Sequence, residues 1–295
     1  MVWTYDNQKA SARPSRVEET GHQANFYSVQ AQDGTWVDDL DRALQKIEDA
    51  ASAPYEMLMA GEIPSGQRKA DFAHFVGALY SRSPAVINAS AKGYAQFLEH
   101  LLDMQCPDRA SFDVFMDRFE RKSGDYDGDR DELFAFMKDK ERYRIEVSQK
   151  RGLNIVAVAD ELAQLLYDRN WYLVDAFEDF FISSDSPVFR WVSEEYSDPL
   201  RGDGGFSNPM AEVSVPLSPR RMLLITGQKM PHQHIVVPAE HVWELNKARA
   251  IEAERFLYSH VRDDRVMKLA VEHNTTRERF VIEGAGPFPE VKVTR

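Results

Sequence analysis

The feature that most constrains the fold is a change of hydrophobic period near residue 170. Between residues 36 and 169, apolar side chains recur at every third or fourth position, as at Leu40, Leu44 and Ile47, which is typical of amphipathic helices. After Asn170, short aromatic and β-branched runs such as 171–174 are bounded by polar clusters, which is typical of strands. The sequence therefore predicts an α+β fold.

We expect a single domain over residues 1–295, with a helical block (36–169) between an N-terminal strand region (1–35) and a C-terminal β-rich region with a closing helix (170–295). The mainly helical block would pack on one small antiparallel or mixed sheet. Pro84 should end one helix and start another. Helices are expected over about 36–51, 66–80, 94–102, 111–123, 131–147 and 155–166, and strands include 2–5, 26–29 and 180–182. The expected core of the block contains Phe72, Phe75, Leu98, Phe115 and Leu162.

Composition places the chain among globular proteins, because 43% of its residues are hydrophobic and 28% are charged. Its 36 basic and 48 acidic residues give a net charge of −12, which repels phosphate backbones, so we expect no extended nucleic-acid groove. The single cysteine, Cys106, favours a reducing compartment. With no secretory signal and no membrane-spanning apolar run, we expect a soluble, cytoplasmic protein without a membrane partner.

Two motifs raise the question of a divalent metal cofactor. Asp125, Asp127 and Asp129 have the spacing of a calcium loop, but Arg130 and Phe136 stand where glycine and glutamate are needed. We interpret this run as a solvated loop that caps the next helix. His232 and His234 would point to the same side of an extended segment and could bind zinc or iron with one carboxylate; the alternative is a solvated loop. Both histidines, with Asp185, are kept as weak metal candidates.

The segment 183–187, Ser-Ser-Asp-Ser-Pro, follows the apolar run 180–182. An aspartate at the end of a buried strand can project from a rigid base into a cleft. Alternatively, Asp185 accepts hydrogen bonds from nearby backbone N–H groups in an Asx-type turn. Spacing alone favours this structural role over a functional one.

Several motifs together resemble domain-of-unknown-function family 4238, a largely bacterial family, over nearly the whole chain. The resemblance implies no particular activity, substrate or cofactor. The motifs that carry it are Phe26-Tyr27-Ser28, Ile47-Glu48, Tyr80-Ser81-Arg82-Ser83-Pro84, Ile182-Ser183-Ser184-Asp185-Ser186-Pro187, Pro216-Leu217-Ser218-Pro219 and Asn246-Lys247-Ala248-Arg249-Ala250.

One departure from the family concerns the start of the chain. Members of the family usually open with a His-Tyr-Val-Pro segment, and this chain begins after the point where that segment would lie. If the histidine of the family is functional, we expect this protein to lack that function or to be a shortened version.

The motif residues suggest a polar pocket made of two acids, a cation and an amide: Glu48, Asp185, Arg82 and Asn246. Such a set could hold a metal or phosphate group, or form a buried ion-pair network. The first hypothesis is a hydrolase acting on a phosphate-bearing substrate, with Asp185, Glu48 and Arg82 catalytic. Ligand-binding residues would be Asn246, Arg249 and Ser184.

The alternative hypothesis is a non-catalytic ligand-binding or protein-interaction module whose polar cluster is structural. One observation separates the two: whether the carboxylates of Glu48 and Asp185 meet Arg82 in one accessible cleft. In either case we expect Arg82 to bind a carboxylate, because its planar guanidinium presents five donors.

Overall fold

The structure is a computed structural model that describes residues 1–17, 20, 29–30, 36–37, 39–143, 145, 155–196 and 203–273. Contacts between Cα atoms divide the chain into two compact units. The first unit is formed by the described residues of Met1–Val86 and Leu153–Arg277, and the second by those of Ile87–Gly152. The expectation of a single domain stays a prediction.

The first unit contains two main sheets. The five-stranded sheet has the order β10-β5-β9-β8-β7, with β10 parallel to β5 and the other neighbours antiparallel. Its strands are β5 (Asn170–Ala176), β7 (Phe189–Trp191), β8 (Glu212–Ser218), β9 (Arg221–Thr226) and β10 (His234–Val237). The antiparallel four-stranded sheet has the order β2-β1-β11-β6. Its strands are β1 (Val2–Asp6), β2 (Ser11–Ser15), β6 (Ser183–Ser184) and β11 (Phe256–Ser259). A separate short pair joins β3 (Val29–Gln30) to β4 (Trp36–Val37).

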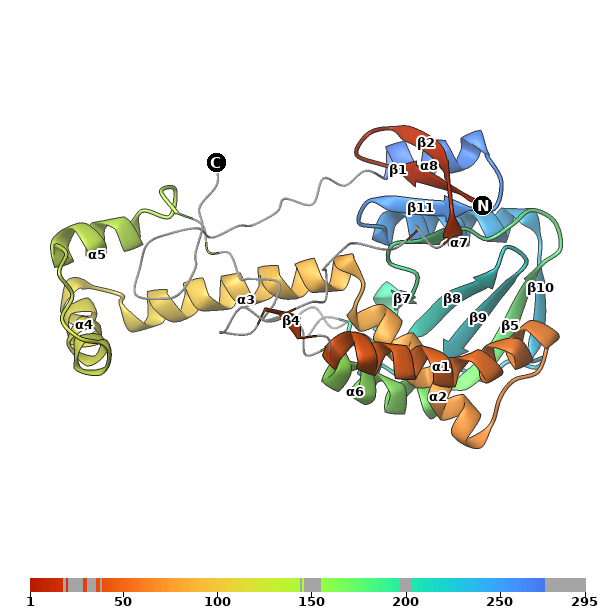
Figure 1. The fold of residues 1–295 in the computed structure, drawn as a ribbon, viewed down its shortest axis with the longest axis horizontal. Helices are drawn as coiled ribbons and strands as arrows, with labels where there is room; N and C mark the ends of the chain where they lie inside the picture. The colour runs from red at the N-terminus through yellow and green to blue at the C-terminus, as the bar shows by residue number, and fades with distance from the viewer. Residues whose placement is uncertain are drawn as a thin grey trace. The chain divides into compact units, whose positions relative to one another are not determined.

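Three helices lie along one side of the five-stranded sheet (Figure 1): α1 (Asp39–Ala60), α2 (Gly66–Ser81) and α6 (Ile155–Tyr167). Helices α2 and α6 approach closely at Gly77, where an added Cβ would lie 2.7 Å from the carbonyl oxygen of Ala159. Glycine is therefore required at this crossing, because any side chain would force the two helices apart.

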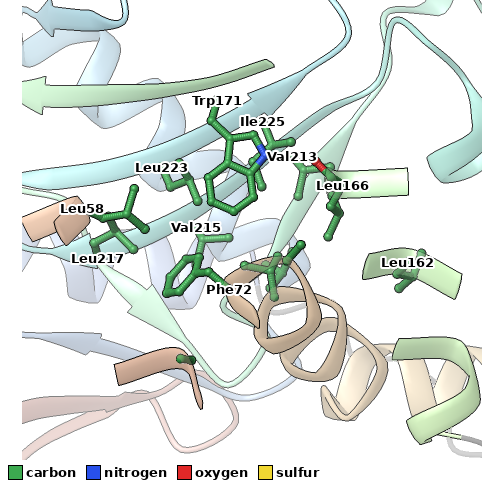
Figure 2. Close-up of a cluster of buried hydrophobic side chains, with 14 of the residues drawn as sticks. Leu58, Phe72, Leu162, Leu166, Trp171, Val213, Val215, Leu217, Leu223 and Ile225 are labelled. Atoms are coloured by element: carbon green, nitrogen blue, oxygen red, sulfur yellow. Dashed lines mark hydrogen bonds between the residues drawn. The ribbon is translucent and has the colours of Figure 1, made fainter. Parts of the chain in front are cut away.

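The main core fills the space between these helices and the sheet (Figure 2). Phe72 of α2 is fully buried and packs against Trp171 of β5. Strand side chains alternate between faces, so Leu173 and Leu223 face this core while Val174 and Met222 face the opposite side. The sheet is thus buried on both faces.

The opposite face is covered by α7 (Ala239–Glu252), through Val242 and its neighbours. Further along α7, Ala250 joins a second cluster with Tyr5 of β1, Leu257 of β11 and helix α8 (Asp264–Glu272). Helix α7 therefore contributes to the cores of both sheets. Two single-turn 3₁₀ helices, Glu194–Tyr196 and Gly205–Ser207, complete the described elements of this unit.

The second unit is helical in its described part. Helix α3 (Pro84–Gln105) enters it at Ile87 and is followed by α4 (Arg109–Ser123) and α5 (Arg130–Lys138). One cluster joins Cys106, Phe112 and Met116 to side chains of α5, and another joins Ala95 to Ile145. Asp108 and Asp129 cap α4 and α5, each accepting hydrogen bonds from backbone N–H groups of the first turn.

The predicted α+β class is confirmed, and so is the new helix at Pro84. Helix α1 continues to Ala60 through Pro54, beyond the expected end near residue 51, and α5 ends at Lys138 instead of near residue 147. Of the expected strand 26–29, residues 26–28 lie outside the described residues. Among the described helices, none is both long and apolar enough to cross a membrane.

Residues 180–182 do not form the strand that their apolar side chains predict. The N–H of Ile182 donates to the side chain of Asn246, and the N–H of Phe181 to the carbonyl of Pro219, so neither joins a ladder with a neighbouring strand. In the expected core, Phe72 and Leu162 are buried. Phe75, Leu98 and Phe115 are only half-buried, because each lies at the side of its helix, next to the buried face.

Candidate functional site

Two of the motifs that carry the family resemblance, 182–187 and 246–250, bind each other through Asn246 of α7. Its side chain is only 1% exposed, and its Oδ1 accepts a hydrogen bond of 3.0 Å from the N–H of Ile182. Its Nδ2 donates a bond of 2.8 Å to the carbonyl oxygen of Phe180. A side-chain amide has one acceptor group and one donor group, as a backbone peptide does, so Asn246 takes the place of the neighbouring strand that residues 180–182 would have in a sheet. We call residues 180–187, which contain this segment and the motif that follows it, the polar strap.

Arg249, one turn further along α7, binds the other end of the polar strap. Arg249 is 2% exposed, and its guanidinium donates to the carbonyl of Pro187 and lies 3.1 Å from Oγ of Ser214 on β8. Burial lowers the pKa of Arg249 to about 9. Its described hydrogen-bond partners are a carbonyl, a hydroxyl and the sulfur of Met222, and none of them is an anion. Arg249 therefore holds the strap against the five-stranded sheet.

Asp185 binds the backbone at the start of β11. Its Oδ1 accepts from the N–H of Glu254 at 2.9 Å, and its Oδ2 accepts from the N–H groups of Arg255 and Phe256 at 2.8 and 3.0 Å. Its own N–H donates to the carbonyl of Phe256. Burial raises the pKa of Asp185 to about 6, although the three N–H donors act in the opposite direction. Asp185 therefore binds backbone amides, as the structural alternative expected, but these lie 69 to 71 residues away along the chain, so the contact is not the Asx-type turn that was predicted.

Ser184 has a local role in the same strap. Its buried Oγ donates 2.8 Å to the carbonyl of Ser186 and lies 3.2 Å from the N–H of the same residue. Ser184, Asp185, Asn246 and Arg249 thus share one task in the described structure, since all four fix the path of the strap between the two sheets.

Glu48 and Arg82 form an ion pair between α1 and the end of α2. The distance from Nη1 of Arg82 to Oε1 of Glu48 is 2.6 Å. The side chain of Arg82 is 19% exposed and that of Glu48 is 40% exposed, so water partly screens the pair. The expectation that Arg82 binds a carboxylate is confirmed, with Glu48 as the partner.

This pair should contribute little to stability. Because the Glu48 side chain is 40% exposed and water screens the pair, we expect Glu48→Gln to lower the free energy of unfolding by about 0.5 kcal/mol. Urea denaturation followed by circular dichroism measures the change. A loss of about 2 kcal/mol or more would instead indicate a desolvated, tightly coupled ion pair.

The metal candidates do not come together in the described residues. His232 and His234 are exposed, and no three His, Cys, Asp or Glu side chains within the described ranges are grouped as metal ligands would be. In the acidic run, Asp125 and Asp127 are exposed and Asp129 caps α5. The catalytic and ligand-binding roles of the candidate residues stay predictions. Among the contacts that the structure describes, Asp185 binds the backbone at the start of β11, whereas Glu48 and Arg82 bind each other.

Sequence reasoning missed a surface of the second unit. Tyr94 and Phe97 lie in the expected helix 94–102, and Met104 lies just beyond it; they are 48%, 52% and 60% exposed. The inward face of α3 is formed by Ala95 and, half-buried, Leu98. The signal was present in the sequence, because apolar residues occupy more than one face of this helix.

A groove runs along α4 in the same unit. It has a volume of about 700 Å³ and is open to solvent. Val114, which contributes to it, is 50% exposed. The described residues that line it are Gln105, Ala110, Ser111, Val114, Phe115, Arg118, Phe119 and Lys122.

Comparison with known proteins identifies a family. No curated protein and no solved structure matches this chain. A family model described as "Protein of unknown function (DUF4238)" matches residues 1–263, which include the polar strap and α7. The match therefore covers both motifs that bind each other in the structure, and the chain belongs to this family of proteins of unknown function.

Proposed function

We propose that this protein is a non-catalytic protein-interaction module whose second unit carries the binding surface. The observation that carries the proposal is an apolar stripe on α3. Tyr94, Phe97, Leu101 and Met104 follow one another at intervals of three, four and three residues, which places them along one side of the helix. Three of the four are about half exposed or more. We call these four residues the α3 stripe.

Contiguous exposed apolar side chains are typical of surfaces that bind other proteins. Tyr94 and Phe97 lie with ring centroids 6.3 Å apart, so they present a joined aromatic surface. The polar candidate residues support the same proposal because their contacts argue against a catalytic site. Asp185, Asn246 and Arg249 use their hydrogen bonds inside the protein, so they are poorly placed to handle a substrate.

The experiment compares complexes recovered from cells by cross-linking and affinity purification. We expect wild-type protein to retain a stoichiometric partner and Phe97→Ser to lose it, because serine removes the aromatic centre of the α3 stripe. Phe177→Ser is the matched control, since Phe177 is 74% exposed in the first unit and undergoes the same chemical change. Both variants should melt like the wild type.

Two results would contradict the proposal. One is equal recovery of the partner with Phe97→Ser and with wild type. The other is hydrolysis of a phosphomonoester or phosphodiester that Asp185→Asn abolishes while the protein stays folded, since this would restore the hydrolase hypothesis.

We also propose that the protein acts in a reducing cytoplasm and has no extended nucleic-acid groove. Cys106 is free and 2% exposed, and burial raises the pKa of its thiol, which makes it unreactive. The net charge of −12 disfavours nucleic acid. Fractionation of expressing cells tests the location.

A further inference from the structure

The groove along α4 combines an apolar floor with a cationic side. Val114, Phe115 and Phe119 supply apolar surface, and two of them, Phe115 and Phe119, also pack on the buried cluster beneath. The floor is therefore anchored to the core of the unit. From Ala110 to Lys122 the lining extends over about 18 Å, the length of about 12 helical residues.

The charges of α4 are separated between two faces. Its acids Asp117 and Glu120 bind Arg130 on the side that faces α5, with oxygen–nitrogen distances of 3.0 and 2.6 Å. Asp113 binds Arg109 on the same helix at 3.1 Å. These acids are thus paired with Arg130 and Arg109, and none of them lines the groove.

The two cations of the groove have no such partners. Arg118 and Lys122 are exposed, line the groove one turn apart, and form no ion pair with any residue that the structure describes. The groove is therefore positive although the whole chain carries a net charge of −12. Unpaired like charges beside an apolar floor favour an apolar ligand with an acidic flank.

We propose that the α4 groove binds an amphipathic helix with an acidic flank, supplied by a partner protein. This inference rests on the proposed function and specifies its partner. Apolar side chains of the incoming helix would pack on Val114 and Phe115, while its Asp or Glu side chains would pair with Arg118 and Lys122. A helix is the natural occupant because the described wall is the side of a helix, and helices pack side by side through such grooves.

The probe is a fluorescent synthetic peptide of about 18 residues, which is long enough to form a helix part of the time in water. Its leucines lie on one face of that helix, and its glutamates lie beside them. A second peptide has lysine in place of every glutamate. Anisotropy titrations use the full chain in low salt. We expect the acidic peptide to bind at least about tenfold more tightly than the basic one, and 0.5 M salt to weaken it.

Matched variants test the groove directly. Arg118→Glu and Lys122→Glu should each weaken the acidic peptide by about tenfold and improve binding of the basic one. Arg121→Glu is the control, because Arg121 lies next to Lys122 on the same turn, is exposed, and does not line the groove. Val114→Asp should weaken both peptides, since it removes apolar floor.

Four outcomes would overturn the proposal. The first two are equal binding of the two peptides and equal effects of Arg121→Glu and Lys122→Glu. The other two are binding of anionic phosphatidylserine vesicles in place of the acidic peptide, and a homodimer that Val114→Asp dissociates. The last two would assign the groove to a membrane or to a second copy. Loss of the cellular partner in Phe97→Ser is scored separately. If that loss occurs but the peptide does not bind, the interaction function stands and only the acidic-helix partner fails.

Discussion

Replacing Phe72 with alanine should lower the free energy of unfolding by about 3–5 kcal/mol, the largest effect we expect from one core substitution. The ring is 0% exposed and lies between α2 and the five-stranded sheet. Its centroid is 6.1 Å from that of Trp171 and 5.5 Å from that of Phe75. Truncation removes these contacts and leaves a cavity that neighbours on a sheet and two helices cannot readily fill.

Urea denaturation measures the free energy of unfolding of Phe72→Ala, and Phe75→Ala serves as the control on the same helix. Phe75 is one turn from Phe72 on the same helix but is only half-buried, so its truncation should cost about 1–2 kcal/mol. Equal losses for the two variants would mean that the packing of α2 against the sheet differs from the structure described.

The difference between these two phenylalanines shows what hydrophobic spacing can and cannot predict. Periodicity identified α2 and its apolar side correctly, because the 3.6-residue period is a local property. It could not rank Phe72 above Phe75, since both lie within the apolar stripe and only the position of the sheet decides which is covered. Helix α1 continues past Pro54 for the same reason: Leu58, 0% exposed, packs in the main core and stabilises the last turns despite the proline.

The candidate site shows a similar limit. Asp185, Asn246 and Arg249 stand out in the sequence as polar residues in the motifs that carry the family resemblance. In the structure, Asp185 belongs to the polar strap, and the other two bind it. Most of their partners are backbone groups about 60 to 70 residues away, and the sequence does not show which side chain binds a given backbone group. A sequence can therefore reveal that a buried polar residue matters without showing whether it binds a substrate or the chain itself.

Asp185 should make the protein less stable as the pH rises from about 4 to 7. Its pKa in the folded protein is about 6, above its ordinary value of 3.8, because burial disfavours the ionised carboxylate. Between these two pKa values the carboxyl of Asp185 is mostly protonated in the folded protein and mostly ionised in the unfolded chain. The stabilisation is complete below the unfolded pKa and is lost as the pH rises through the folded one; two pKa units correspond to about 3 kcal/mol.

Asp185→Asn isolates this contribution, since asparagine does not titrate. Asp6 and Asp179 act in the opposite direction. Burial raises their pKa values, but hydrogen bonds and ion pairs lower them by more, so both carboxylates stabilise the fold as the pH rises. Both residues are present in wild type and in the variant, so their contributions cancel in the difference. The stability of wild type relative to Asp185→Asn should therefore fall by about 2.5 kcal/mol between pH 4 and pH 7, as measured by denaturant titration at each pH.

The variant should still be the less stable protein at pH 4. Both oxygens of Asp185 accept backbone N–H groups, so one of them must be replaced by an NH₂ that faces a donor at Glu254 or at Arg255 and Phe256. A difference that stays constant from pH 4 to pH 7 would show that Asp185 keeps an ordinary pKa, with its three N–H donors outweighing burial. A difference that grows with pH would mean that those donors hold the pKa below its ordinary value, and the carboxylate would then stabilise the fold in its ionised form.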